Sequence, residues 1–269
     1  MRILTELDRR IIISYIKKEP ELNLMISSAI EKYGVNSENV HIYAAGDREE
    51  WDCLLVQYYD DYMIYSQQEE LPFLELAQFL GKRQVDCIRG KIAHIKPLRT
   101  FYPNCILKEN NLCCYKRKEW ETSQLRRRSL ADNKIRITRL YAEDSAAMME
   151  VYLSAEEFAR TFQYPEKSER KIRMELEDGE LAVGVYENGR LVSVARTSGS
   201  DCSGTMIVCV ATNPVCRGKG YSTQAVQVLC DKAFEAGKQF LCLYYSNPTA
   251  GRIYEKIGFQ VIGDYAMLR

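Results

Sequence analysis

The chain between residues 208 and 221 reads Val208-Cys209-Val210-Ala211-Thr212-Asn213-Pro214-Val215-Cys216-Arg217-Gly218-Lys219-Gly220-Tyr221. It opens with an apolar, β-branched run that is typical of a buried strand, and the residues after it have the apolar spacing of a helix. Between the two, Gly218 and Gly220 allow a sharp turn that points several amide N–H groups outward at the positive end of the helix. The stretch therefore predicts a strand, a loop and a helix around a socket for an anion, most simply a phosphate.

Strand and helix patterns alternate throughout the second half of the chain. An Asn188-Gly189 pair between two apolar runs is a strong signal for a two-residue hairpin. We expect strands at residues 135–140, 181–186, 191–195, 206–211, 240–245 and 260–268, and helices at 142–155, 168–176, 221–236 and 248–257. This order predicts an α/β unit with a mixed sheet.

The first half loosely repeats this order of elements. We expect helices at residues 7–16, 21–33 and 71–80, strands at 40–44, 53–58, 62–65 and 85–88, and a closing hairpin over 105–115 with its turn at Glu109-Asn110-Asn111. The position that corresponds to the glycine loop reads Gln67-Gln68-Glu69-Glu70. That segment is acidic and lacks glycine, so it is not expected to bind a phosphate in the same way.

A polar, basic stretch separates the two halves. It contains Lys116-Arg117-Lys118 and Arg126-Arg127-Arg128, with few apolar side chains. A solvated connector is favoured over a contact with nucleic acid, because no interleaved aromatic residues extend the basic run. The predicted organisation is an α/β domain at 1–116, a linker at 117–134 and a second α/β domain at 135–269.

Composition limits the environment and the chemistry. Lys plus Arg and Asp plus Glu each number 37, so no global charge favours nucleic acid or an anionic membrane. No run has the length of a membrane span, and the first ten residues lack the apolar core of a signal peptide, which predicts a cytoplasmic protein. The ten cysteines form no Cys-x-x-Cys pair and only His41 and His94 are available, so no metal is expected.

A second segment of interest runs from Asn247 to Phe259, directly after an expected strand. On a helix, Ala250 and Tyr254 lie one turn apart on a single face, and Asn247 stands where that face begins. An amide, a small residue and a phenol are therefore expected to point toward the same neighbour. Taken alone, Tyr254 would be read as an ordinary core or surface tyrosine.

Together, the two segments resemble the GNAT superfamily of N-acetyltransferases, over roughly residues 134–269. The family's donor-binding pattern, Gln/Arg-x-x-Gly-x-Gly/Ala, falls on Val215 to Gly220, and only Val215 departs from it. A downstream pattern, Asn-x-x-Ala-x-x-x-Tyr-x-x-x-Gly-Phe, falls without departure on Asn247, Ala250, Tyr254, Gly258 and Phe259. The resemblance implies the GNAT fold, a mixed and mostly antiparallel central sheet flanked by helices. The first half then looks like a degenerate GNAT-like domain.

The resemblance also implies acetyl-CoA as the donor and a primary amine as the acceptor, which attacks the thioester directly. Tyr254 would be the general acid that protonates the departing thiolate. Glu143, Glu156 and Glu157 are candidates for the general base. The residues expected to bind the donor are Val210, Thr212, Arg217, Gly218, Lys219, Gly220, Tyr221, Ser222, Asn247 and Ala250.

Two other functions stay open on the sequence. The chain could be a non-catalytic acyl-CoA-binding regulatory module, or a transferase that uses a different acyl-CoA. The acceptor could be a small molecule or a peptide, because a donor site does not define its partner amine. A homodimer is also open.

Overall fold

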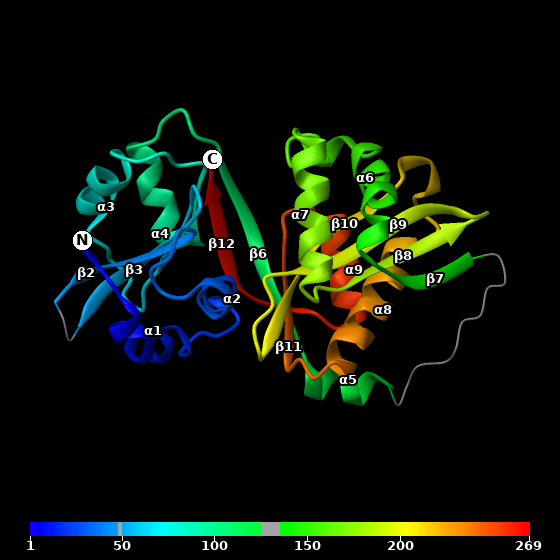
Figure 1. Ribbon diagram of the computed structural model, residues 1–269, viewed down its shortest axis with the longest axis horizontal. Helices are drawn as coiled ribbons and strands as arrows, with labels where there is room; N and C mark the ends of the chain where they lie inside the picture. The colour runs from blue at the N-terminus through cyan, green and yellow to red at the C-terminus, as the bar shows by residue number, and fades with distance from the viewer. Residues whose placement is uncertain (48–49, 125–134) are drawn as a thin grey trace. The chain divides into compact units, whose positions relative to one another are not determined.

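The computed structural model describes residues 1–47, 50–124 and 135–269. These residues form two compact units (Figure 1). Unit 1 comprises Met1–Cys113, Tyr244–Pro248 and Val261–Arg269, and unit 2 comprises Cys114–Leu243 and Thr249–Gln260. The chain therefore passes between the units more than once.

Unit 1 is a sheet with helices on both faces. Its strand order is β1-β2-β3-β4-β5-β12, followed by β6 (Leu107–Lys116). The β4–β5 pair is parallel, whereas the β1–β2, β2–β3, β3–β4 and β5–β12 pairs are antiparallel. The strands are β1 (Arg2–Ile3), β2 (Val40–Gly46), β3 (Trp51–Tyr58), β4 (Asp61–Tyr65), β5 (Cys87–Lys91) and β12 (Gln260–Leu268). The helices are α1 (Arg9–Ile16), α2 (Leu24–Tyr33), α3 (Phe73–Leu80) and the short α4 (Ile92–Ile95).

Alternate residues of the unit 1 strands enter two separate cores. Leu54 and Val56 of β3 pack with residues of α1 and α2, such as Ile12 and Ile30. Their neighbours in the same strand, Cys53 and Leu55, pack on the other face with residues of α3, α4 and β12. This is the two-residue period of a strand whose two faces are both covered.

Unit 2 has the same arrangement of elements. Its strand order is β11-β10-β9-β8-β7, with a parallel β10–β11 pair and antiparallel pairs elsewhere. Helices α6 and α7 cover one face of this sheet, and α8 contacts β8, β9 and β10. The elements are β7 (Ile135–Leu140), α6 (Ser145–Leu153), α7 (Pro165–Glu177), β8 (Ala182–Glu187), β9 (Arg190–Ser198), β10 (Gly204–Thr212), α8 (Tyr221–Glu235), β11 (Phe240–Tyr245) and α9 (Pro248–Ile257).

The expected fold class is confirmed. Each unit is a mixed, mostly antiparallel sheet flanked by helices, and the order strand, two helices, three strands, helix, strand occurs in both. Asn188 and Gly189 have φ values of 53° and 79° and join Glu187 to its ladder partner Arg190. Two positive φ angles at a two-residue turn are the geometry that an Asn-Gly pair favours.

The hairpin expected over residues 105–115 is wrong. A single strand, β6 (Leu107–Lys116), runs through the expected turn. The Asn110 side chain is buried, and its amide donates to the Lys108 carbonyl at 3.2 Å. No residue of this strand has a positive φ angle, so the Asn-Asn pair lies in extended backbone and makes no turn.

The first part of the expected linker is helical, and its role as a connector stays a prediction. Residues Arg117–Gln124 form helix α5. Trp120 stacks on Phe234 of α8 at 5.2 Å, and its Nε1 donates to Asp231 Oδ1 at 2.7 Å. The Arg126-Arg127-Arg128 run lies outside the described residues. The compact units divide the chain at Cys113, and Val261–Arg269 belong to unit 1. The expected domain limits at residues 116 and 135 stay a prediction.

A side chain at position 258 is expected to destabilise unit 2. The φ angle of Gly258 is 127°, and an added Cβ would lie 2.7 Å from Cε2 of Tyr115, whose ring also contacts Phe234 and Phe259. Backbone strain and a clash in a packed core each destabilise, so Gly258→Ala should lower the free energy of unfolding by about 2–4 kcal/mol. Urea unfolding followed by circular dichroism measures this loss.

Gly263→Ala is the matched control. Gly263 lies in β12 without a positive φ angle, and an added Cβ would meet nothing within 4 Å. Equal unfolding midpoints for the two variants would contradict the packing role of Gly258.

Candidate functional site

The glycine loop precedes α8 as expected. Gly218 and Gly220 have φ values of 81° and 79°, and α8 begins at Tyr221. A Cβ on either glycine would meet nothing within 4 Å, so the left-handed backbone, rather than space, is what requires glycine here. The loop therefore presents backbone amides at the N-terminus of a 15-residue helix, where the helix dipole favours an anion.

Two carboxylates contact the side chains of this loop. Glu187 Oε1 lies 2.8 Å from Lys219 Nζ and accepts a 2.6 Å hydrogen bond from the Tyr221 hydroxyl. Hydrogen bonds from Lys219 and then Tyr221 lower the pKa of Glu187, so it is a carboxylate at neutral pH. Glu157 Oε1 lies 2.6 Å from Nη2 of Arg217. Each basic side chain of the loop is thus already paired with an acid.

We predict that Glu187→Gln strengthens the binding of coenzyme A. The substitution removes a negative charge beside the loop and frees Lys219, whereas the exposed position limits the gain to about threefold in Kd at low salt. Isothermal titration calorimetry at low and at high ionic strength measures the effect, which should shrink as salt is added. A Glu187→Gln variant that binds coenzyme A more weakly would mean that the carboxylate supports the loop and does not compete with the ligand.

The strand before the loop is interrupted by a bulge. Val208 pairs with Arg196 and Ala211 pairs with Val194, so Cys209 and Val210 together stand opposite one residue of β9. Cys209 has a φ angle of 51°, which is unusual for a residue other than glycine. Bulges change the direction of backbone groups, so this one gives β10 amides and carbonyls outside the regular ladder.

Thr212 follows the bulge and is fixed by two contacts. Its hydroxyl lies 2.8 Å from Ser193 Oγ, and its carbonyl accepts from Nε of Arg217 at 3.2 Å. The last residue of the strand is thereby tied to the first residue of the glycine loop.

Helix α9 positions the second set of predicted residues. Tyr254 is 8% exposed, and its ring meets that of Phe259 edge-on at 6.0 Å. Its carbonyl accepts from the amides of Gly258 and Phe259 at 3.1 and 3.0 Å, so these two residues close the helix. Ala250 and Tyr254 belong to unit 2, whereas Asn247 precedes α9 and belongs to unit 1.

The sequence of this region matches a known family. Residues 145–259 match the sequence model of the acetyltransferase (GNAT) family. They form a GNAT domain. A search among curated proteins finds no match.

Solved structures share the fold of the whole chain, GNAT domain included. A Drosophila protein is similar with a TM-score of 0.70 at 11% identity, covering 99% of this chain and 97% of its own. A GCN5-related N-acetyltransferase from Kribbella flavida has a TM-score of 0.63 at 16% identity, covering 92% and 95%. A tandem GNAT protein from the clavulanic acid biosynthesis pathway has a TM-score of 0.58 at 8% identity, covering 99% and 96%. At these identities the likeness establishes the fold alone.

The three candidate bases, Glu143, Glu156 and Glu157, all lie in unit 2. Glu157 is paired with Arg217; burial would raise its pKa, but hydrogen bonds from its own backbone and from Arg217 lower it. A general base works best with a pKa near the operating pH, so this pairing argues against Glu157. Glu143 and Glu156 are both exposed, on the short 3-10 turns Ala142–Asp144 and Glu156–Phe158.

Several residues of the site were missed by the sequence reasoning. Glu187, Glu175 and Arg196 contribute charges close to the loop or the bulge. No local pattern marks them, because their partners are distant in the sequence.

Among the described residues no helix combines the length and apolar character needed to cross a bilayer, and no group of His, Cys, Asp or Glu could hold a metal ion.

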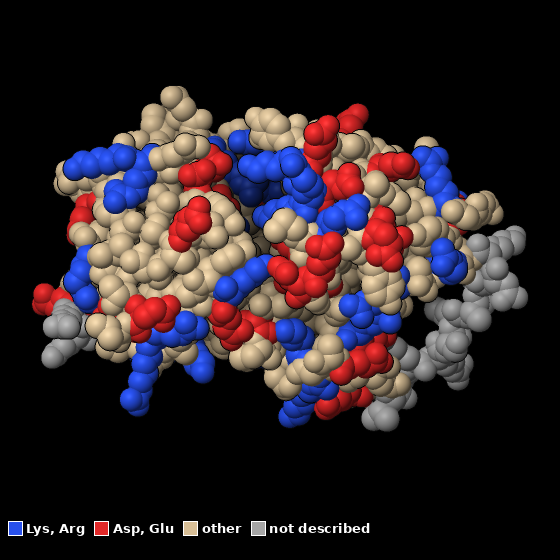
Figure 2. Space-filling view, viewed as in Figure 1, with Lys and Arg blue, Asp and Glu red and all other residues tan. Residues whose placement is uncertain are grey.

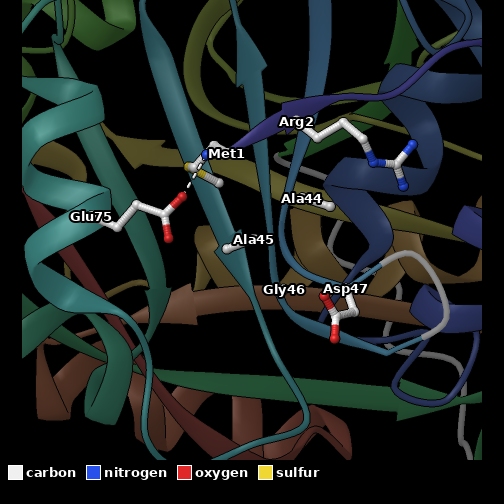
Figure 3. A pocket seen from close by; sticks show the side chains of 7 residues that line it. All are labelled: Met1, Arg2, Ala44, Ala45, Gly46, Asp47 and Glu75. Carbon is white, nitrogen blue, oxygen red and sulfur yellow. Dashed lines mark hydrogen bonds and ion pairs between the residues drawn. The ribbon is translucent and has the colours of Figure 1, made fainter.

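Unit 1 has a hollow of its own, outside the GNAT domain (Figure 3). The cavity has a volume of 610 Å³. The Met1 ammonium pairs there with Glu75 Oε1 at 2.5 Å. None of the predicted donor-binding residues lines it; the lining residues are Met1, Arg2, Ala44, Ala45, Gly46, Asp47 and Glu75.

The face in Figure 2 shows acidic and basic side chains interspersed over much of its area, in keeping with the balanced composition.

Proposed function

We propose that the chain is an acetyl-CoA-dependent N-acetyltransferase that moves an acetyl group to a primary amine by direct attack. The observation that supports this most strongly is the pair of left-handed glycines, Gly218 and Gly220, at the start of α8 and just after the bulged strand β10. This combination offers amides to a pyrophosphate at one end, and backbone groups outside the regular ladder to an extended pantetheine arm at the other.

The proposed donor contacts follow the chain from strand to helix. Backbone groups of the bulged strand pair with the pantetheine amides, and the loop amides bind the pyrophosphate. Asn247 binds the pantetheine arm at the start of α9, and Ala250 leaves room for it. The full proposed set is Val210, Thr212, Arg217, Gly218, Lys219, Gly220, Tyr221, Ser222, Asn247 and Ala250.

The proposed reaction needs no covalent enzyme intermediate. The amine nitrogen attacks the thioester carbonyl, a C–N bond forms, and a backbone amide near the bulge stabilises the oxyanion. The C–S bond then breaks, and the hydroxyl of Tyr254 donates its proton to the departing thiolate. The amine loses its own proton to ordered water or to a base, so charge and protons balance. Acetyl-CoA is a co-substrate in this scheme, and no metal takes part.

Binding and turnover test the proposal separately. A ligand that binds only the folded protein raises its stability, so coenzyme A or acetyl-CoA at about 100 times Kd should raise the melting temperature by roughly 5–10 °C. Release of free thiol from acetyl-CoA in the presence of a panel of primary amines, including polyamines, aminoglycosides and peptides, then measures transfer. Absence of any thermal shift with either ligand would refute the proposal.

The panel also decides between the proposal and its two rivals. Binding of coenzyme A without thiol release from any acyl-CoA supports the regulatory module, and release only from propionyl-CoA or a longer thioester supports another acyl group. The acceptor is proposed only as an amine-bearing small molecule or peptide. A cytoplasmic site of action and a homodimer remain predictions.

A further inference from the structure

A buried ion pair lies directly beside the bulge of β10. Arg196 on β9 donates from Nη1 to Oε2 of Glu175 on α7 at 2.5 Å. The side chain of Arg196 is 8% exposed and that of Glu175 is 15% exposed. Removing two charges from water costs free energy that their attraction only partly offsets. Stability alone is therefore a weak reason for an ion pair at this position.

Arg196 also contacts the bulge itself. It is the ladder partner of Val208, the last regular pair before the register shifts. Its Nη2 lies 3.9 Å from the sulfur of Cys209, the residue with the left-handed backbone. Such a conformation persists in a residue other than glycine only where the surroundings hold it. One guanidinium thus joins the strained residue of β10 to a carboxylate of α7.

Ser198 and Tyr152 also face this ion pair, and each is held by contacts of its own. Ser198 Oγ donates to Glu175 Oε1 at 3.1 Å, so both carboxylate oxygens have donors. Tyr152 of α6 is fully buried and stacks on Phe162 at 4.7 Å. Burial first, and then the neighbouring Cys209, raise the pKa of Tyr152, so its hydroxyl stays protonated at neutral pH. The nearby Arg196 guanidinium opposes this rise in the pKa of Tyr152 in part.

We infer that Arg196 and Glu175 are positioning residues that hold the Cys209–Val210 bulge in the shape that aims a backbone amide at the acetyl carbonyl. The inference rests on the proposed function, because it assigns the bulge to the acyl end of the donor. An amide stabilises an oxyanion only when it lies within hydrogen-bond distance of the position that the oxygen takes, so a small shift of the bulge is costly. The planar fork of arginine reaches Glu175 and Cys209 together, which the single ammonium of lysine does not.

Two variants test the inference without leaving an unpaired buried charge. Arg196→Lys keeps a cation beside Glu175 and removes the fork that reaches Cys209. The double variant Arg196→Met, Glu175→Leu removes both charges, a replacement that proteins often tolerate. The control is Arg173→Gln, Glu169→Gln, which removes another ion pair of α7, at 3.6 Å and more exposed. Circular dichroism and melting curves establish that each protein is folded.

The decisive readout compares the Kd for coenzyme A with the Kd for acetyl-CoA, both by isothermal titration calorimetry. Only acetyl-CoA has the thioester carbonyl that the bulge amide is proposed to bind. Both test variants should therefore bind acetyl-CoA about tenfold more weakly, while their Kd for coenzyme A changes less than twofold. With the best amine found for the wild type, kcat should fall by about 100-fold, far more than KM for acetyl-CoA rises. The control should behave as the wild type.

Other outcomes separate the two proposals. A wild type that binds neither ligand refutes the proposed function before any variant is made. A wild type that binds both, with test variants that weaken both ligands equally or neither, overturns only the positioning role. If the double variant fails to fold, Arg196→Lys gives the same comparison.

Discussion

Tyr254→Phe is expected to reduce acetyl transfer by about 100-fold or more while the Kd for coenzyme A stays within about twofold of the wild-type value. General acid catalysis typically contributes two to four orders of magnitude, and only the hydroxyl supplies the proton. The ring of Tyr254 packs against Phe259, and phenylalanine keeps that packing. Steady-state kcat and calorimetric Kd, measured on the same preparation, separate the loss of the proton donor from a loss of binding.

Tyr164→Phe is the matched control for this variant. Tyr164 is 65% exposed and immediately precedes α7, so this variant loses the same hydroxyl at a residue to which no role is assigned. We expect its kcat to equal that of the wild type. A Tyr254→Phe enzyme with unchanged kcat would show that the thiolate leaves unprotonated or takes its proton from water.

Gly220→Val should abolish most of the affinity for coenzyme A. A β-branched residue rarely adopts the left-handed backbone that Gly220 has at a φ angle of 79°, so the loop must reshape. Each hydrogen bond to a charged group contributes about 1.5–3 kcal/mol, so losing two loop amides weakens Kd by about 100-fold or more. Isothermal titration calorimetry with coenzyme A measures the change.

The opposite end of the same helix supplies the control. Gly237 follows α8 with a φ angle of 99°, and an added Cβ there would also meet nothing within 4 Å. Gly237→Val introduces similar backbone strain and should lower the melting temperature, yet leave the Kd for coenzyme A unchanged. Equal loss of affinity in both variants would indicate that strain in α8, and not the loop amides, controls binding.

Local patterns predicted the elements of the second half of the chain well. Glycine spacing, the Asn188-Gly189 turn and the apolar period of α8 each act within a few residues, so their signals are visible in the sequence. The strand from Ile135 to Leu140 and the strand from Phe240 to Tyr245 have the expected bounds. The same reasoning failed at Asn110-Asn111, because both residues favour turns, yet the strand continues through them.

The charges of the site could not be predicted in this way. Glu157 meets Arg217 across 60 residues, and Glu187 meets Lys219 across 32. Such pairs depend on how strands and helices are brought together, and a single sequence does not record that. The strand at residues 260–268 was predicted, but its antiparallel pairing with β5, far back in the chain, was not.

That pairing has a consequence for how the protein is made. Because β12 lies between β5 and β6 in the sheet, the ribosome must translate nearly all of unit 2 before β5 receives this partner strand. Domains usually fold in the order of their synthesis. Here unit 1 is synthesised first, but the edge of β5 stays unpaired until β12 has been translated. A chain interrupted after residue 259 would expose the edge of β5 in unit 1, so premature termination should lead to aggregation through that unit.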